Sequence, residues 1–410
     1  MNTVPRLPEP AIARRRALAL LSLVGLAAAI GVGRLAAPLD AGEPPAPAGP
    51  VAPPGPVRPT SPAPAAPRVP ATRPFRLGFT RWPADLTLEG VRTAETFALA
   101  HGDVVSVMMI GGIPWEESLT GAPYSRDVEA AFAWKPPAGT KVFLSISPLD
   151  MLRRGLAPNW GERDNQPLPR AWAARTFDAP EVRRAYLAFT LRAVEAMRPD
   201  WLAIGVELND LLSNDPAAWP ALKRLHRETY AAVKARHPAL PVCFTTDVLH
   251  YKRLAAEAKG SDQEGEVADL MEASDLFAMS VYPYMSPALA QPFPDGFFDF
   301  ARGFRKPVAV SESGYTSRDV VLASFGVTLA GTEDLQRRWL SALFATATRD
   351  RYEFVVQFAT TDFERLCDRL SPPTDDLARV WSFTGLQTSD GKRKPAAATW
   401  DAVFATPYAR

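Results

Sequence analysis

The chain has 410 residues, and its charges nearly cancel, with 46 Lys and Arg against 45 Asp and Glu and a formal net charge of +1 at pH 7. Phosphate binding needs a clustered positive field, and the part expected to fold contains no basic run, so the charge balance argues against a nucleic-acid partner. A division into ~150 residues per domain would give two or three domains, but a single α/β barrel takes ~250 residues or more by itself.

Residues 1–37 have the pattern of an export signal. Arg14, Arg15 and Arg16 precede an apolar run at residues 17–33, which small residues follow. A positive segment, an apolar segment and small residues are what a secretory signal requires. The run is slightly short for the ~20 residues of a membrane-spanning helix. A cleaved signal peptide and an uncleaved membrane anchor therefore stay open, and both predict a location outside the cytoplasm.

Residues 38–74 are rich in Pro and Ala and nearly free of large apolar side chains. Such a segment cannot bury a core, and its prolines favour extended conformations. We predict a disordered linker here, followed by one folded domain at residues 75–410. The two cysteines, Cys243 and Cys367, make no disulfide framework and are expected to be buried free thiols.

From residue 75 onward, short apolar runs alternate with longer amphipathic stretches. Each run is nearly continuous in Val, Ile, Phe, Leu or Ala, which is typical of parallel strands covered on both faces. The expected strands are residues 75–80, 103–109, 141–147, 201–207, 241–247, 276–283, 307–313 and 354–360.

The stretches between the runs predict helices, most clearly at residues 180–197, where Pro180 suits the first turn. Residues 217–236, 333–349 and 394–404 follow the same pattern. Eight strand–helix units predict a (β/α)₈ TIM barrel of the α/β class. An open doubly wound sheet is the alternative. It usually has a Gly-rich phosphate turn after its first strand, and residues 78–81 (Gly-Phe-Thr-Arg) form no such turn.

Two glutamates stand at the ends of the fourth and seventh expected strands, where barrel active sites lie. Glu207 ends one apolar run and Glu312 ends the other. Period-two alternation puts Glu207 on the same side as Ala203, and Glu312 on the same side as Val310, so both carboxylates are predicted to face the barrel mouth. A pair of facing carboxylates is the machinery of glycoside hydrolysis, one as acid and one as nucleophile or base.

The segments around these residues resemble clan A glycoside hydrolases, most closely the family 53 endo-β-1,4-galactanases. Residues 306–315 (Lys-Pro-Val-Ala-Val-Ser-Glu-Ser-Gly-Tyr) resemble that family's nucleophile strand, residues 278–284 its sixth strand and residues 205–209 its fourth. The resemblance implies a retaining hydrolase that cleaves β-glycosidic bonds of a polysaccharide. It makes Glu207 the acid/base, Glu312 the nucleophile and Tyr282 a neighbour of the nucleophile.

The chain departs from the pattern of the clan at two positions. Val206 stands where an Asn normally contacts the sugar 2-hydroxyl, and the second strand ends without the usual Arg. Asn209 is a candidate for the missing sugar contact. These departures keep a second hypothesis open, a non-catalytic barrel that binds carbohydrate or cell-wall material.

Three further side chains are predicted to bind substrate. Trp115 follows the second strand and offers an aromatic face, Asp247 ends the fifth strand, and Tyr315 follows the nucleophile strand. For Asp247, a helix N-cap is the simpler interpretation. No cofactor and no metal are expected, because the four His residues lack ligand spacing.

Overall fold

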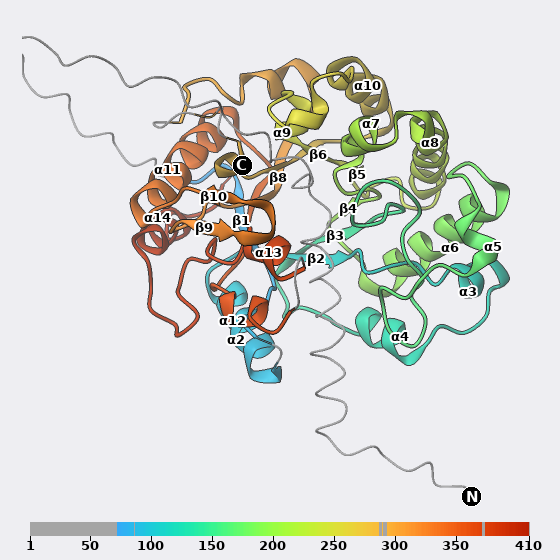
Figure 1. Cartoon of the computed structure of the whole chain (residues 1–410), viewed down its shortest axis with the longest axis horizontal. Coiled ribbons are helices and arrows are strands. Elements are labelled where there is room, and N and C mark those ends of the chain that lie inside the picture. Colours follow the sequence, from blue (N-terminus) through green and yellow to red (C-terminus); the bar gives the residue numbers. More distant parts are fainter. Residues whose placement is uncertain (1–71, 86, 287–288, 290–292, 371–373, 410) are drawn as a thin grey trace, which may run out of the picture.

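The computed structural model describes residues 72–85, 87–286, 289, 293–370 and 374–409 (Figure 1). The predicted export signal and nearly all of the predicted linker therefore lie outside the described residues. Within them, every helix is too short or too polar to cross a membrane.

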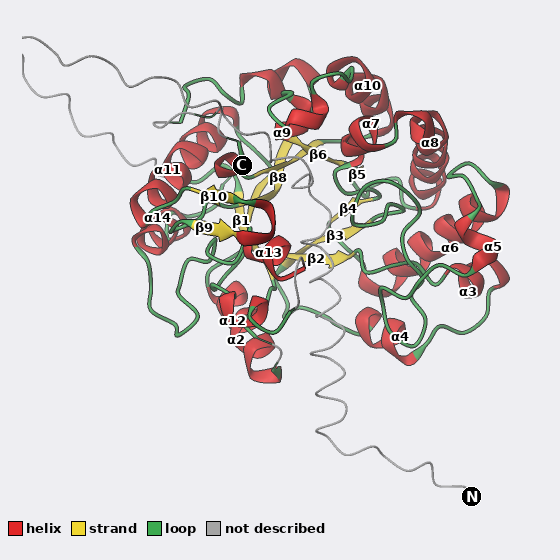
Figure 2. Ribbon diagram, in the orientation of Figure 1, coloured by secondary structure: helices red, strands yellow, loops and turns green. Residues whose placement is uncertain are grey.

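The described strands form a parallel ring with helices around it, which confirms the predicted α/β barrel (Figures 1 and 2). All eight predicted strands are present, with the fifth split in two. The ring consists of β1 (Arg76–Thr80), β2 (Val104–Met109), β3 (Lys141–Ile146), β4 (Trp201–Ala203), β5 (Val242–Cys243) with β6 (Thr245–Asp247), β7 (Phe277–Val281), β8 (Val308–Ser313) and β11 (Phe354–Gln357).

The ring closes through the fifth strand. Its strand order runs β5-β4-β3-β2-β1-β11-β8-β7-β6, so the two ends of the sheet are consecutive in the chain and separated only by Phe244. The backbone N–H of Thr245 donates to the carbonyl of Gly205 at 2.9 Å. Because this segment touches both neighbours, the nearly closed barrel brings the ends of the fourth and fifth strands side by side.

The four helices singled out from the sequence are confirmed, α6 within its predicted bounds. A short hairpin between β8 and α11, made of β9 (Val320–Leu322) and β10 (Val327–Leu329), was not predicted. The helices are α2 (Leu88–Ala100), α3 (Trp115–Thr120), α4 (Arg126–Phe132), α5 (Arg170–Ala173), α6 (Pro180–Met197), α7 (Leu211–Asn214), α8 (Trp219–Arg236), α9 (Val248–Tyr251), α10 (Gln263–Leu270), α11 (Glu333–Asp350), α12 (Glu364–Cys367), α13 (Thr374–Arg379) and α14 (Pro395–Phe404).

Two apolar layers hold the barrel together. The larger one fills the space between strands and helices, and a smaller one fills the ring itself. In the ring, Phe354 packs against Phe143 with ring centroids 5.0 Å apart and against Trp201 at 4.9 Å. Small residues such as Ala278 and Ala309 complete this inner layer. Cys243 and Cys367 are buried and unpaired, as predicted.

Helix α14 closes the ring of helices through Trp400, which is fully buried. Its ring lies 4.4 Å from that of Phe79 on β1, and its indole N–H donates to the carbonyl of His101 at 2.8 Å. Trp400→Ala is expected to lower the free energy of unfolding by about 3–5 kcal/mol, because it leaves a large cavity. Denaturant unfolding measures the loss. Val321→Ala, at a side chain that is 62% exposed, is the control and should change stability by less than about 0.5 kcal/mol.

Candidate active site

The backbone turns sharply at Glu207. Strand β4 stops at Ala203, and Glu207 adopts φ 50° and ψ 47° at the start of a 3₁₀ turn, Leu208–Asp210. A non-glycine residue in this left-handed region costs about 1–3 kcal/mol and persists only where surrounding contacts fix it. The side chain is 2% exposed. The predicted strand 201–207 is therefore shorter than expected, and the turn aims Glu207 at the barrel mouth.

A threonine from the neighbouring strand holds this turn. The backbone N–H of Glu207 donates to Oγ1 of Thr245 on β6 at 2.8 Å. Thr245→Val keeps the shape but leaves that buried N–H without an acceptor, which costs about 1–3 kcal/mol. We expect a lower melting temperature and lower activity for Thr245→Val, and near-normal values for Thr245→Ser, which keeps the hydroxyl. Equal losses in both variants would show that the hydroxyl does not hold the turn.

Glu312 reaches the mouth by a different route from the one predicted. Val308 and Val310 belong to the outer layer, and Ala309 to the inner one, so simple alternation would turn Glu312 toward the helices. Strand β8, however, contains an extra residue. Met279 and Ser280 on β7 pair with Val310 and Glu312, and β11 shows the same shift. A β-bulge of this kind re-aims one side chain. Period-two alternation was therefore the wrong reason to expect Glu312 at the barrel mouth. The bulge is what turns its side chain there.

Each glutamate accepts one strong hydrogen bond from a buried donor. The hydroxyl of Tyr282, which follows β7, donates to Oε1 of Glu312. The guanidinium of Arg153, in the loop after β3, donates from Nη2 to Oε2 of Glu207 at 2.8 Å. Glu312 is 8% exposed and Tyr282 3%. The prediction that Tyr282 neighbours the presumed nucleophile thus agrees with the geometry.

The two carboxylates are close enough to influence each other's charge. Burial, and then the neighbouring charge of Glu207, raise the pKa of Glu312 to about 8, against the lowering effects of Tyr282 and Arg153. The charge of Glu207 also acts on the carboxyl group of Asp247. Burial raises the pKa of Asp247 to about 6, with Glu207 adding to the rise and His250 opposing it. The mouth therefore holds several carboxyl groups that cannot all ionise together at neutral pH.

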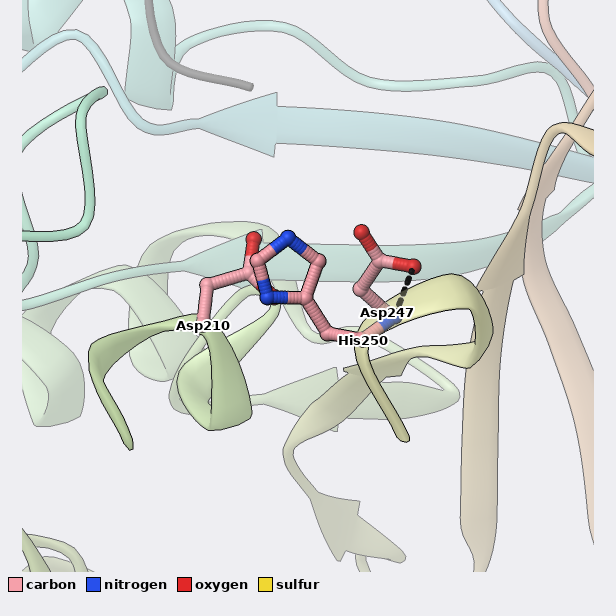
Figure 3. A group of neighbouring side chains, drawn as sticks. All are labelled: Asp210, Asp247 and His250. Atoms are coloured by element: carbon pink, nitrogen blue, oxygen red, sulfur yellow. Dashed lines mark hydrogen bonds and ion pairs between the residues drawn. The ribbon is translucent and has the colours of Figure 1, made fainter. Parts of the chain in front are cut away.

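Asp210, Asp247 and His250 lie close together (Figure 3), and the two aspartates are near enough to Glu207 to feel its charge. One ligand atom from each lies within 4.8 Å of the others, so these residues could in principle hold a metal ion. His250 already bridges two acids, with Nδ1 3.4 Å from Asp210 and Nε2 3.4 Å from Glu257. Despite burial, these acids raise the pKa of His250 to about 10. A protonated ring of His250 therefore supplies a positive charge beside these acids.

Asn209 does not replace the missing sugar contact. Its amide nitrogen donates to the carbonyl of Asp247 at 3.0 Å and to Gln263 at 2.9 Å, and its Oδ1 accepts from the N–H of Asp247 at 2.8 Å. The side chain is fully buried. Asn209 thus ties the ends of the fourth and fifth strands together, and its predicted substrate role is not supported by the geometry.

The other three predicted substrate residues have different surroundings in the structure. Trp115 is fully buried, stacks on Trp172 at 5.2 Å and donates to the carbonyl of Ala157, so it offers no face to a sugar. Asp247 caps α9 through Oδ1, which accepts from the N–H of Leu249 at 2.7 Å, and it also lies in the field of Glu207. Tyr315 is buried and packs against Tyr284 with ring centroids 5.5 Å apart.

The sequence interpretation missed two residues of the site. Arg153 was hidden in residues 150–154 (Asp-Met-Leu-Arg-Arg), an ordinary polar loop. Its position after the third strand was the available signal, because loops at that end of a barrel line the active site. Trp381 packs against Tyr282 with centroids 6.0 Å apart. It follows α13, far beyond the eighth strand, and the sequence carries no signal for this contact.

Taken together, the fold and the site define a class of protein. An α/β barrel with buried, neighbouring carboxylates at the ends of its fourth and seventh strand positions has the architecture of a glycoside hydrolase. More particularly, the sequence model of Glycosyl hydrolase family 53 matches residues 157–339. That stretch includes Glu207, Tyr282 and Glu312, and the match agrees with the resemblance to family 53 glycoside hydrolases.

Solved structures support the fold. The β-glucuronidase of Ruminococcus gnavus is 12% identical, with TM-score 0.50, over 82% of this chain and 50% of its own, so the chain spans about half of its length. The exo-β-1,4-mannosidase of Opitutaceae bacterium strain TAV5 is 15% identical, with TM-score 0.55, over 81% and 59%. A GH5_18 protein from Streptomyces cattleya, in complex with Manb1-4GlcNAc, is 18% identical, with TM-score 0.52, over 80% of each chain. No curated protein matches significantly.

Proposed function

We propose that the chain is an exported hydrolase that cleaves β-glycosidic bonds of a polysaccharide with retention of anomeric configuration. The observation that carries the proposal is the pair of buried carboxylates, Glu207 and Glu312, each with its own donor, at the mouth of the barrel. Export rests on the basic and apolar pattern of residues 14–34 alone.

In the proposed reaction, Glu312 attacks the anomeric carbon and forms a covalent glycosyl–enzyme bond. Glu207 gives its proton to the departing glycosidic oxygen, so the leaving chain departs as an alcohol. Water then attacks the anomeric carbon and returns its proton to Glu207, and the bond to Glu312 breaks. Tyr282 fits this assignment, because its hydroxyl orients Oε1 of Glu312.

The pair needs one proton for this reaction, and its position matters. In the substrate-free structure, Arg153 pairs with Glu207 at 2.8 Å, and the raised pKa of Glu312 favours the protonated form of Glu312. The assignment of roles requires the proton on Glu207 when the glycosidic bond breaks. Substrate binding must therefore be accompanied by transfer of this proton from Glu312 to Glu207.

A second candidate is a barrel that binds glycan without cleaving it. Val206 favours it, because an apolar side chain 3% exposed cannot donate to a sugar hydroxyl. The donors on both glutamates favour the enzyme, because binding alone does not need two oriented carboxyl groups.

A screen of polysaccharides tests the proposal, with β-1,4-galactan, β-mannan and β-glucan as the first substrates. Release of reducing ends, followed by ¹H NMR of the first-formed anomer, distinguishes the outcomes. A β product supports the retaining mechanism, and an α product points to inversion. Glycan binding without release of sugar would favour the second candidate.

A further inference from the structure

Arg153 contacts Glu207 but takes no part in the bond changes of the proposed reaction. Its side chain is 1% exposed, and Nη2 lies 2.8 Å from Oε2 of Glu207. Nη1 donates to the carbonyls of Asp150 at 3.1 Å and Met151 at 3.3 Å. The residue itself has φ 52°. A strained loop thus fixes the guanidinium in place by its own backbone carbonyls, as expected of a group with a set orientation.

The charges around the carboxylates explain why a fixed cation is needed there. Two adjacent buried carboxylates cannot both ionise without compensation. His250 does not compensate them, because Asp210 and Glu257 flank its two ring nitrogens. In the part of the chain that the structure describes, the charged or titratable groups around the pair come from five segments. They are Arg153 after β3, Asp210 in the 3₁₀ turn after β4, Asp247 on β6, His250 on α9, and Tyr282 with Tyr284 after β7.

We infer that Arg153 is the counter-ion of the catalytic pair, balancing the single negative charge that Glu207 and Glu312 share. The inference rests on the proposed function. The second strand ends without the Arg that is usual in clan A, and Arg153 in the loop after the third strand supplies a positive charge instead. Arg153 acts through Glu207 and is a positioning residue. Because an arginine stays charged at any working pH, it keeps the pair singly ionised over the whole active range.

The pH dependence of kcat/KM tests this role on the polysaccharide that the screen identifies. Loss of a positive charge at this distance raises the pKa of a carboxyl group by about 1–3 units. The acidic limb of the profile is therefore expected to shift to higher pH by about 1–3 pH units in Arg153→Met. Arg153→Lys keeps a positive charge and should shift the limb less. The control is Arg73→Met. Arg73 is a buried arginine that pairs with Asp103 at 2.7 Å, at the opposite end of the barrel, and its loss should leave the limb in place.

A second measurement does not depend on activity. Melting temperatures of the whole chain are compared at pH 7 for wild type, Arg153→Met, Glu207→Gln and the double variant. Arg153→Met leaves a buried carboxylate without its cation and should lower the melting temperature most. Adding Glu207→Gln removes that carboxylate and should recover part of the loss.

The outcomes separate the two claims. Suppose that no glycan is cleaved but that the double variant recovers part of the melting temperature. The proposed function then fails, while Arg153 remains the counter-ion of the carboxylates. If glycan is cleaved and the acidic limb does not move in Arg153→Met, the counter-ion role is overturned while the proposed function stands. Additive losses in the double variant would also overturn the role, because the two groups would then not be coupled.

Discussion

Replacing Glu312 by glutamine is expected to abolish hydrolysis, and replacing Glu207 by glutamine to reduce it by about 10²–10⁴-fold. Glutamine is nearly isosteric, so both variants keep their shape and can still accept from Tyr282 or Arg153. Without a carboxylate at position 312 no covalent intermediate forms, and without a proton at position 207 the leaving oxygen departs as a poor leaving group. Initial rates on the best polysaccharide measure both effects.

The control for this experiment is Glu228→Gln. Glu228 lies on the outer face of α8, with a side chain 47% exposed and paired with Arg183. The same chemical change at this position should leave the rate unaltered. Retention of wild-type rates in Glu312→Gln would remove Glu312 from the reaction.

Glu312→Gln is also expected to make the protein more stable than wild type above about pH 5. Burial, with the charge of Glu207, raises the pKa of Glu312 from its ordinary value of 4.5 to about 8. Between these two values the unfolded chain releases the proton and the folded chain keeps it, so wild-type stability falls as the pH rises. The difference between the proteins should grow from near zero below pH 4.5 to on the order of a few kcal/mol at pH 8 and above.

Denaturant unfolding of both proteins at pH 4.5, 7 and 8.5 measures this effect. The difference between the curves reports the titration of Glu312 together with its coupling to Glu207 and Asp247. Parallel pH curves for the two proteins would mean that Glu312 keeps an ordinary pKa in the folded state.

The barrel itself was predictable because its strands are covered on both faces. Continuous apolar runs such as β2 and β3 need no tertiary information to be recognised, and α6 begins at a proline that suits a first helical turn. The turn at Glu207 was not predictable. Its left-handed backbone depends on the hydrogen bond that the N–H of Glu207 donates to Thr245, which lies 38 residues further along the chain.

The two glutamates of the candidate site could be predicted from the sequence. The contacts that orient them could not. The bulge that turns Glu312 inward depends on pairing with both neighbours of β8, and period-two alternation gives the opposite face. Gly112 shows the same limit. It has a φ of 135°, and an added Cβ would meet the carbonyl of Pro158 at 2.7 Å, so this glycine is required by packing against a loop distant in the sequence.

Covalent trapping tests the central claim most directly. The protein is incubated with the 2-deoxy-2-fluoro glycosyl fluoride of the sugar that the screen identifies, digested, and mapped by mass spectrometry. The proposed mechanism predicts one added glycosyl group, carried by the peptide that contains Glu312 and absent from Glu312→Gln. A label on Glu207, or turnover with an α product and no label, would contradict it.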